Sequence, residues 1–75
     1  MNFEQLGELR AQYINALKNE TAILAELMAY TATSEIDHAK FQSLMTAASV
    51  ARADAQEAGK RWNDAVEALW PKVLG

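Results

Sequence analysis

The chain of 75 residues contains no cysteine, one histidine, one proline and three glycines. Without cysteine no disulfide can form, and a zinc site built from thiolates and imidazoles has too few ligands. A chain this short gains only ~3–5 kcal/mol of net stability from one hydrophobic core. We therefore expect a single small domain over residues 1–75 that is stabilised further by self-association or by a protein partner.

Clustered basic residues are also lacking, with seven scattered Lys and Arg against ten Asp and Glu and a net charge of −3. Because duplex binding requires clustered cations, direct binding to nucleic acid is not expected. The most apolar run, residues 21–34, carries Glu26 and is shorter than the ~20 residues that span a bilayer. The N-terminus lacks the basic and apolar regions of a signal peptide, so we expect a cytoplasmic protein without membrane contact.

The shortage of proline and glycine and the abundance of alanine favour helix along most of the chain. Asn2 and Gln5 have the spacing of a capping box, which predicts a first helix over about residues 3–30. Ser34 is a favourable N-cap, which predicts a turn at 31–34 and a second helix from about residue 35. Pro71 disfavours helical geometry in the residue before it, so this helix is predicted to end at residue 70, before a short tail at 71–75.

Apolar residues recur at heptad spacing along both predicted helices, as in the seam of a coiled coil. In the first helix they are Leu6, Leu9, Tyr13, Ala16, Ile23, Leu27 and Tyr30. In the second they are Phe41, Leu44, Ala48, Ala51, Ala55, Ala58, Trp62, Ala65 and Leu69. The tight turn aligns the two rows with Ile23 opposite Phe41 and Leu9 opposite Ala55. The predicted fold class is therefore all-α, an antiparallel two-helix hairpin.

This register leaves the chain from about residue 64 onward projecting beyond the start of the first helix. The projecting segment is rich in large apolar side chains, including Trp70, and such side chains are typical of interface hot spots. We expect an intermolecular contact there. The alternative is a local cap in which Pro71 turns the tail back over Phe3 and Trp62.

A second apolar surplus lies near the turn, where Leu24, Met28, Met45 and Val50 fall outside the seam. Two apolar faces predict a bundle of more than two helices, most simply a homodimer of hairpins forming a four-helix bundle. Filling of gaps in an ordinary core is the alternative role for the methionines. The predicted partner-binding residues are Met28, Tyr30, Met45, Trp62, Val66, Leu69, Trp70, Val73 and Leu74.

Glu20 falls on the seam of the first helix, facing Leu44 in the predicted register. An unpaired buried carboxylate is costly. Three interpretations are open: the side chain reaches water, it pairs with Arg52 of a neighbouring chain, or it marks a break in the helix after Asn19.

Only Glu35 and His38 have the spacing of a metal-binding pair, the Glu-x-x-His motif of di-iron bundles. Their place in the first turn of the second helix favours a helix-dipole role for the carboxylate instead. We therefore expect no cofactor and no metal, with a metal-binding four-helix bundle as an alternative. The chain has no nucleophile paired with a base and no phosphate-binding loop, so it is not expected to be an enzyme.

These features predict a non-enzymatic protein–protein interaction module that acts through exposed apolar helix faces. Inhibitors and adaptors of this size occur among bacterial and phage accessory proteins. The stretch 39–42 (Ala-Lys-Phe-Gln) slightly resembles the second helix of the small co-chaperones of type III secretion needle subunits. This resemblance covers no diagnostic motif and assigns no family, but a co-chaperone for a secretion or assembly component is the alternative function.

Overall fold

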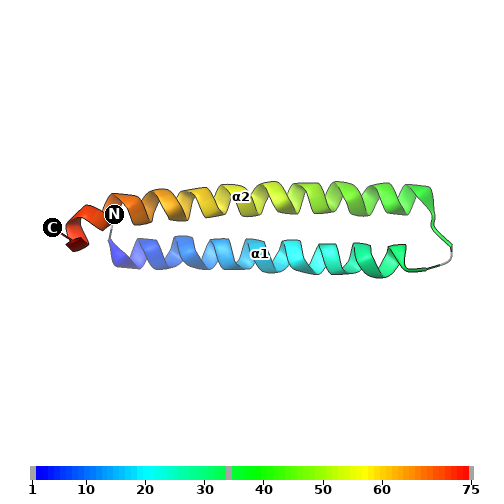
Figure 1. Cartoon of the computed structure of the whole chain (residues 1–75), viewed down its shortest axis with the longest axis horizontal. Coiled ribbons are helices and arrows are strands. Elements are labelled where there is room, and N and C mark those ends of the chain that lie inside the picture. The colour runs from blue at the N-terminus through cyan, green and yellow to red at the C-terminus, as the bar shows by residue number, and fades with distance from the viewer. Residues whose placement is uncertain (1, 34, 75) are drawn as a thin grey trace.

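A computed structural model of the chain shows two long helices that lie side by side and run in opposite directions (Figure 1). Helix α1 spans Phe3–Thr31 and helix α2 spans His38–Leu74. The structure describes the backbone of residues 2–33 and 35–74 and the side chains of residues 2–33 and 35–69. Within these residues there is no strand, and the rod measures 59 × 16 × 14 Å. The predicted all-α helical hairpin is confirmed.

Helix α1 begins at the predicted capping box. The Oδ1 atom of Asn2 accepts a hydrogen bond from the backbone N–H of Gln5 at 2.8 Å. In return, Oε1 of Gln5 accepts from the backbone N–H of Asn2 at 3.1 Å. The helix then continues unbroken to Thr31, so the interpretation of a break after Asn19 is wrong.

Helix α2 begins later than predicted, at His38, and Asp37 caps it. The Oδ1 atom of Asp37 accepts from the backbone N–H of Ala39 at 3.0 Å, and its carbonyl accepts from Phe41 at 2.9 Å. Aspartate is as good an N-cap as serine. Ser34 lies outside the described residues. The connection between the helices therefore covers residues 32–37 and is longer than the predicted turn.

Helix α2 also ends later than predicted, because it continues through Pro71 to Leu74. Proline removes one backbone hydrogen bond and crowds the preceding turn, which bends a helix but does not always end it. Figure 1 shows the last turns of α2, drawn in red, bent away from the axis of the rest of the helix. Since this segment is helical, the chain does not turn back at Pro71 as the alternative interpretation required.

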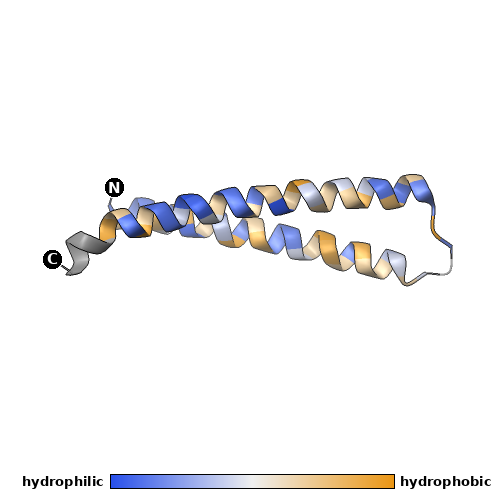
Figure 2. Cartoon of the chain, turned by 45° about the horizontal axis from the view of Figure 1, so that its top comes forward, coloured by the Kyte–Doolittle hydropathy of each residue, from blue (hydrophilic) through white to orange (hydrophobic). Residues whose placement is uncertain are grey.

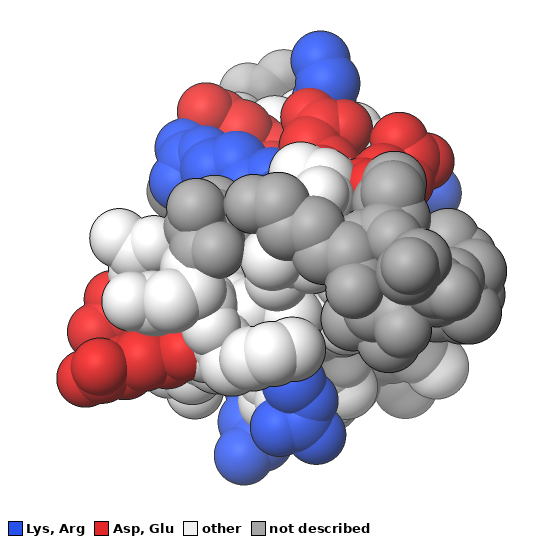
Figure 3. Space-filling model, turned by 90° about the vertical axis from the view of Figure 1, so that its left-hand side faces the viewer, with Lys and Arg blue, Asp and Glu red and all other residues white. Residues whose placement is uncertain are grey.

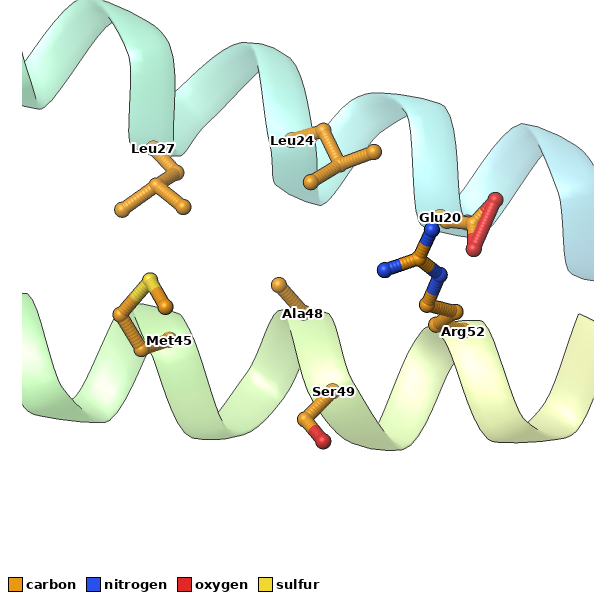
Figure 4. A pocket seen from close by; sticks show the side chains of 7 residues that line it. All are labelled: Glu20, Leu24, Leu27, Met45, Ala48, Ser49 and Arg52. Atoms are coloured by element: carbon orange, nitrogen blue, oxygen red, sulfur yellow. The ribbon is translucent and has the colours of Figure 1, made fainter.

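The longer connection changes the register of the two helices. Leu24 lies across from Ala48, and Glu20 lies across from Arg52 (Figure 4). In the predicted register Glu20 would face Leu44, which lies about two helical turns earlier in α2. The predicted pairing of residues across the hairpin is therefore wrong, although the same two apolar rows meet.

The shifted register removes most of the predicted projecting segment. The start of α1 lies beside the part of α2 that precedes its last turn, at one end of the rod, the terminal end, opposite the turn end formed by the connection (Figure 1). Only the last turn of α2 extends beyond α1. Ala65 and Leu69 are only 3% and 7% exposed, and Val66 is half-buried. The hairpin itself thus covers side chains that the sequence left without a partner. The side chains of Trp70, Val73 and Leu74 lie outside the described residues.

The interior of the hairpin is thin and consists of small side chains. Among the side chains that the structure describes, the buried apolar ones all come from the predicted seam of α2: Ala48, Ala51, Ala55, Ala58, Ala65 and Leu69. No residue of α1 is buried, and within the described residues no large side chain is fully buried. The seam was predicted correctly, but it supplies little apolar burial.

Gly59 marks a close contact in this seam. A Cβ atom added to Gly59 would lie 2.9 Å from Cε1 of Tyr13, whose ring centroid is 6.3 Å from that of Trp62. A Cβ atom added to Gly7 would meet nothing within 4 Å. The two glycines therefore differ in what an alanine would encounter.

Gly7→Ala is expected to stabilise the hairpin by about 1 kcal/mol, the usual difference in helix propensity. Gly59→Ala gains the same propensity but forces the ring of Tyr13 to move, and overpacking costs about 1–3 kcal/mol. We therefore expect Gly59→Ala to be destabilising by roughly 1 kcal/mol. Urea unfolding followed by circular dichroism measures both, and equal stabilisation by the two substitutions would contradict the close contact.

Candidate protein-binding groove

A groove of about 440 Å³ opens between α1 and α2 on one face of the rod, nearer its turn end (Figure 4). The better-buried Leu27 and Ala48 lie at its base, and the more exposed Leu24 and Met45 lie along its sides. The remaining lining residues are Glu20, Ser49 and Arg52. The lining is thus mainly apolar, with an acidic and a basic group at the end nearer the termini.

The groove follows from unequal side chains on the two helices. Leu24 of α1 lies across from the small Ala48 of α2, whereas Leu27 lies across from Met45 (Figure 4). Small residues let two helices approach but leave space beside the line of closest contact. A neighbouring helix with protruding apolar side chains can occupy such a space.

A smaller hollow of about 150 Å³ continues along the same side of the hairpin. It shares Glu20 and Arg52 with the groove and adds Tyr13, Leu17, Ala55 and Gln56. Because the two hollows share residues of both helices, they belong to one surface. We call this surface, formed by the residues lining both hollows, the groove face.

Large apolar side chains are exposed on and beside the groove face. Leu17, Leu24 and Met45 line it and are 38%, 42% and 47% exposed. Met28, 70% exposed, follows Leu24 by one helical turn and so lies on the same side of α1. Figure 2 shows hydrophobic residues, in orange, concentrated in α1 between its middle and the turn end. This is the largest concentration of exposed apolar side chains in the described part of the chain.

Glu20 is half-buried, and it faces Arg52 of its own chain. Figure 4 shows the guanidinium of Arg52 extended towards α1 beside Glu20. Within residues 2–33 and 35–69, however, the only ion pair joins Arg61 and Glu57 at 2.6 Å, along α2. The two groups therefore lie near each other without a direct ion pair, and pairing with a neighbouring chain stays a prediction.

Tyr30, predicted to bind a partner, contacts the connection between the helices through its hydroxyl group. Its hydroxyl accepts from the backbone N–H of Asp37 at 2.6 Å and lies 3.2 Å from the carbonyl of the same residue. Nζ of Lys40 lies 5.0 Å from the centre of the Tyr30 ring, a cation–π distance. The hydroxyl of Tyr30 is thus engaged within the chain.

The other predicted partner-binding residues fall into two separate regions. Met28 and Met45 are exposed beside the groove, whereas Trp62, Val66 and Leu69 lie towards the terminal end and are half-buried or buried. Sequence reasoning left Leu17 and Leu24 out of the predicted site. Their spacing of seven residues, followed by Met28 four residues later, was the available signal, because it marks a second heptad row on α1.

Acidic and basic side chains are interspersed on the surface of the rod. Viewed from the terminal end, acidic and basic side chains lie next to one another around the rim (Figure 3). The exposed pair of Glu57 and Arg61 is of this kind, and such pairs contribute only about 0.3–0.5 kcal/mol. These surfaces have the mixed character of an ordinary solvated helix face.

The helical pairing of Glu35 with His38 is wrong, because Glu35 lies in the connection and not in α2. His38 is exposed, with its Nε2 atom 3.3 Å from Nε2 of Gln42. In the part of the chain that the structure describes, no three His, Asp or Glu side chains are grouped so that they could hold a metal ion. The spacing on which the metal-binding alternative depended does not place its two ligands on one helical face.

Neither described helix is long and apolar enough to cross a membrane. In comparisons with known proteins, the chain matches no family model, no curated protein and no solved structure. A functional proposal therefore depends on the physical character of the groove face.

Proposed function

We propose that this chain is a non-enzymatic protein–protein interaction module whose groove face binds an apolar helical surface of a protein. The observation that carries the proposal is the groove itself, an apolar channel with Leu24 and Met45 exposed along its sides. Helix-in-groove recognition uses apolar anchors spaced three, four and seven residues apart. Leu17, Leu24 and Met28 have this spacing on α1.

We further propose that the bound protein is a second copy, so that two hairpins form a four-helix bundle. A compact protein of 8.3 kDa exposes about 4,600 Å². This hairpin exposes 5675 Å². The excess of about 1,100 Å² is more than the roughly 800 Å² that each partner buries in an interface of standard size. Dimerisation through the groove face would also add large apolar side chains to an interior made mainly of alanine.

The surface is tested with Leu24→Glu and the matched substitution Val50→Glu. Val50 is 56% exposed but does not line the groove. A carboxylate at position 24 would be buried without a partner in the complex, so we expect association to weaken roughly tenfold or more. Light scattering across a range of concentrations measures the mass, and circular dichroism shows that the helices persist.

The Val50→Glu variant should associate like the unaltered chain. If both variants associate normally, the groove face is not the binding surface. If the unaltered chain is a monomer at all concentrations, the second copy is ruled out, and the groove must be tested with other proteins.

A further inference from the structure

We infer that the two hairpins of the dimer lie parallel, with their turn ends together and the two-fold axis along the rod. In this arrangement α1 of each copy lies over α2 of the other, and Glu20 faces Arg52 of the partner subunit. The inference rests on the proposed dimer and adds its orientation and its ion pairs.

Charge complementarity selects this axis. Glu20 and Arg52 lie at the same level of the rod on different helices of the groove face. A two-fold axis along the rod keeps every residue at its level and exchanges the helices, so each Glu20 meets an arginine and each Arg52 meets a glutamate. An axis across the rod at this level places each helix over its own copy, which brings like charges together and is unfavourable.

The distribution of apolar side chains selects the same orientation. Leu24, Met28 and Met45 lie on the turn-end side of Glu20 and Arg52. Towards the terminal end, the row of α1 continues with Leu17, the exposed Arg10 and the exposed Phe3, and α2 adds the exposed Gln56 and the half-buried Val66. Parallel hairpins bring Leu24, Met28 and Met45 of the two copies together. Antiparallel hairpins of full overlap would instead lay these three side chains over the terminal half of the partner subunit, where Arg10 and Gln56 would lose hydrogen bonds to water.

Parallel hairpins also make every neighbouring pair of helices antiparallel. Within each copy α1 already runs against α2, and across the interface α1 again runs against α2 of the partner subunit. This alternation sets the partial charges of neighbouring helix ends in favourable opposition. In an antiparallel dimer, α1 would lie along α1 of the partner subunit and α2 along α2, and these neighbouring helices would also run in opposite directions. The helix dipoles therefore permit both orientations, and the charged and apolar side chains decide between them.

The cross-chain ion pairs are tested by mixing two charge-reversed chains, Glu20→Arg and Arg52→Glu. Each variant alone brings like charges together at this level, both within the chain and across the interface. In the mixed dimer every position 20 faces an opposite charge of the partner subunit. We expect the mixed dimer to exceed each like dimer by about tenfold or more in native mass spectrometry. A statistical mixture would overturn the ion pairs.

The orientation is tested with nitroxide labels on single cysteines, Glu35→Cys at the turn end and Glu4→Cys at the terminal end. The chain has no other cysteine, and both positions are exposed. Pulsed electron resonance then gives the distance between the two labels of a dimer. In the parallel dimer both distances are limited by the width of the bundle, about twice the 16 Å width of one hairpin.

An antiparallel dimer of full overlap would separate both pairs of labels by a distance near the 59 Å length of the rod. An antiparallel dimer that overlaps only at the turn ends would separate the Glu4→Cys labels still further. Either long distance overturns the parallel orientation while leaving the proposed dimer intact. If no dipolar coupling between labels is detected and the mass is that of a monomer, both the dimer and its orientation are overturned.

Discussion

Ala55→Asp is expected to unfold most of the protein at room temperature. Ala55 is 3% exposed and lies in the middle of the α2 seam, against α1. A carboxylate there would lose most of its water and would crowd the close contact with α1, at a cost of more than about 3 kcal/mol. A small domain has only ~3–5 kcal/mol of net stability, so the loss approaches the whole amount.

Ala53→Asp is the matched control, because Ala53 is exposed on the opposite side of the same turn. The chemical change and the loss of helix propensity are the same at both positions, and only burial differs. We expect Ala53→Asp to cost less than about 1 kcal/mol. Urea unfolding followed by circular dichroism measures both. Similar losses for the two variants would mean that the alanine row of α2 is not the inner face of the hairpin.

Leu69→Ala is expected to destabilise the protein by about 2–4 kcal/mol. Leu69 is 7% exposed and is the largest of the buried side chains, in a hairpin whose interior is otherwise alanine. Truncation of a buried leucine removes its transfer free energy and leaves a cavity, and the two effects together determine how far the free energy of unfolding falls. The measurement is again the free energy of unfolding in urea.

The result for Leu69→Ala also distinguishes the two registers of the hairpin. In the register expected from sequence, Leu69 projects beyond α1, and its truncation would change the stability of the hairpin by no more than about 0.5 kcal/mol. Val50→Ala, at a 56% exposed position, shows the effect of truncating an apolar side chain in solvent. Equal effects of Leu69→Ala and Val50→Ala would contradict the observed register.

The helices and their inner faces could be predicted from sequence, whereas the register could not. Capping residues and heptad spacing are local signals, and Asn2 with Gln5 formed the expected capping box. A heptad pattern, however, matches itself after a shift of two helical turns, so several registers bring the same rows together. The register was decided by the connection, and there both Ser34 and Asp37 were possible caps. The choice of Asp37 lengthened the connection and moved every pairing along α2.

The candidate site was predicted only in part for the same reason. Met28 and Met45 were identified because they lie outside the seam, and they do border the groove. The groove itself depends on which residues of α2 lie across from Leu24 and Leu27, here Ala48 and Met45, and this follows from the register. The expected contact surface at the end of α2 depended on a projecting segment that the observed register largely covers.

The thermal unfolding midpoint, measured by circular dichroism over a thousandfold range of protein concentration, tests most directly whether this hairpin is completed by a second copy. If folding and association are coupled, the midpoint rises with concentration, because mass action stabilises a folded dimer. We expect a continuous rise, and we expect Leu24→Glu to reduce both the midpoint and its dependence on concentration. A midpoint that is independent of concentration across this range would show that the hairpin is stable alone and would contradict the proposed dimer.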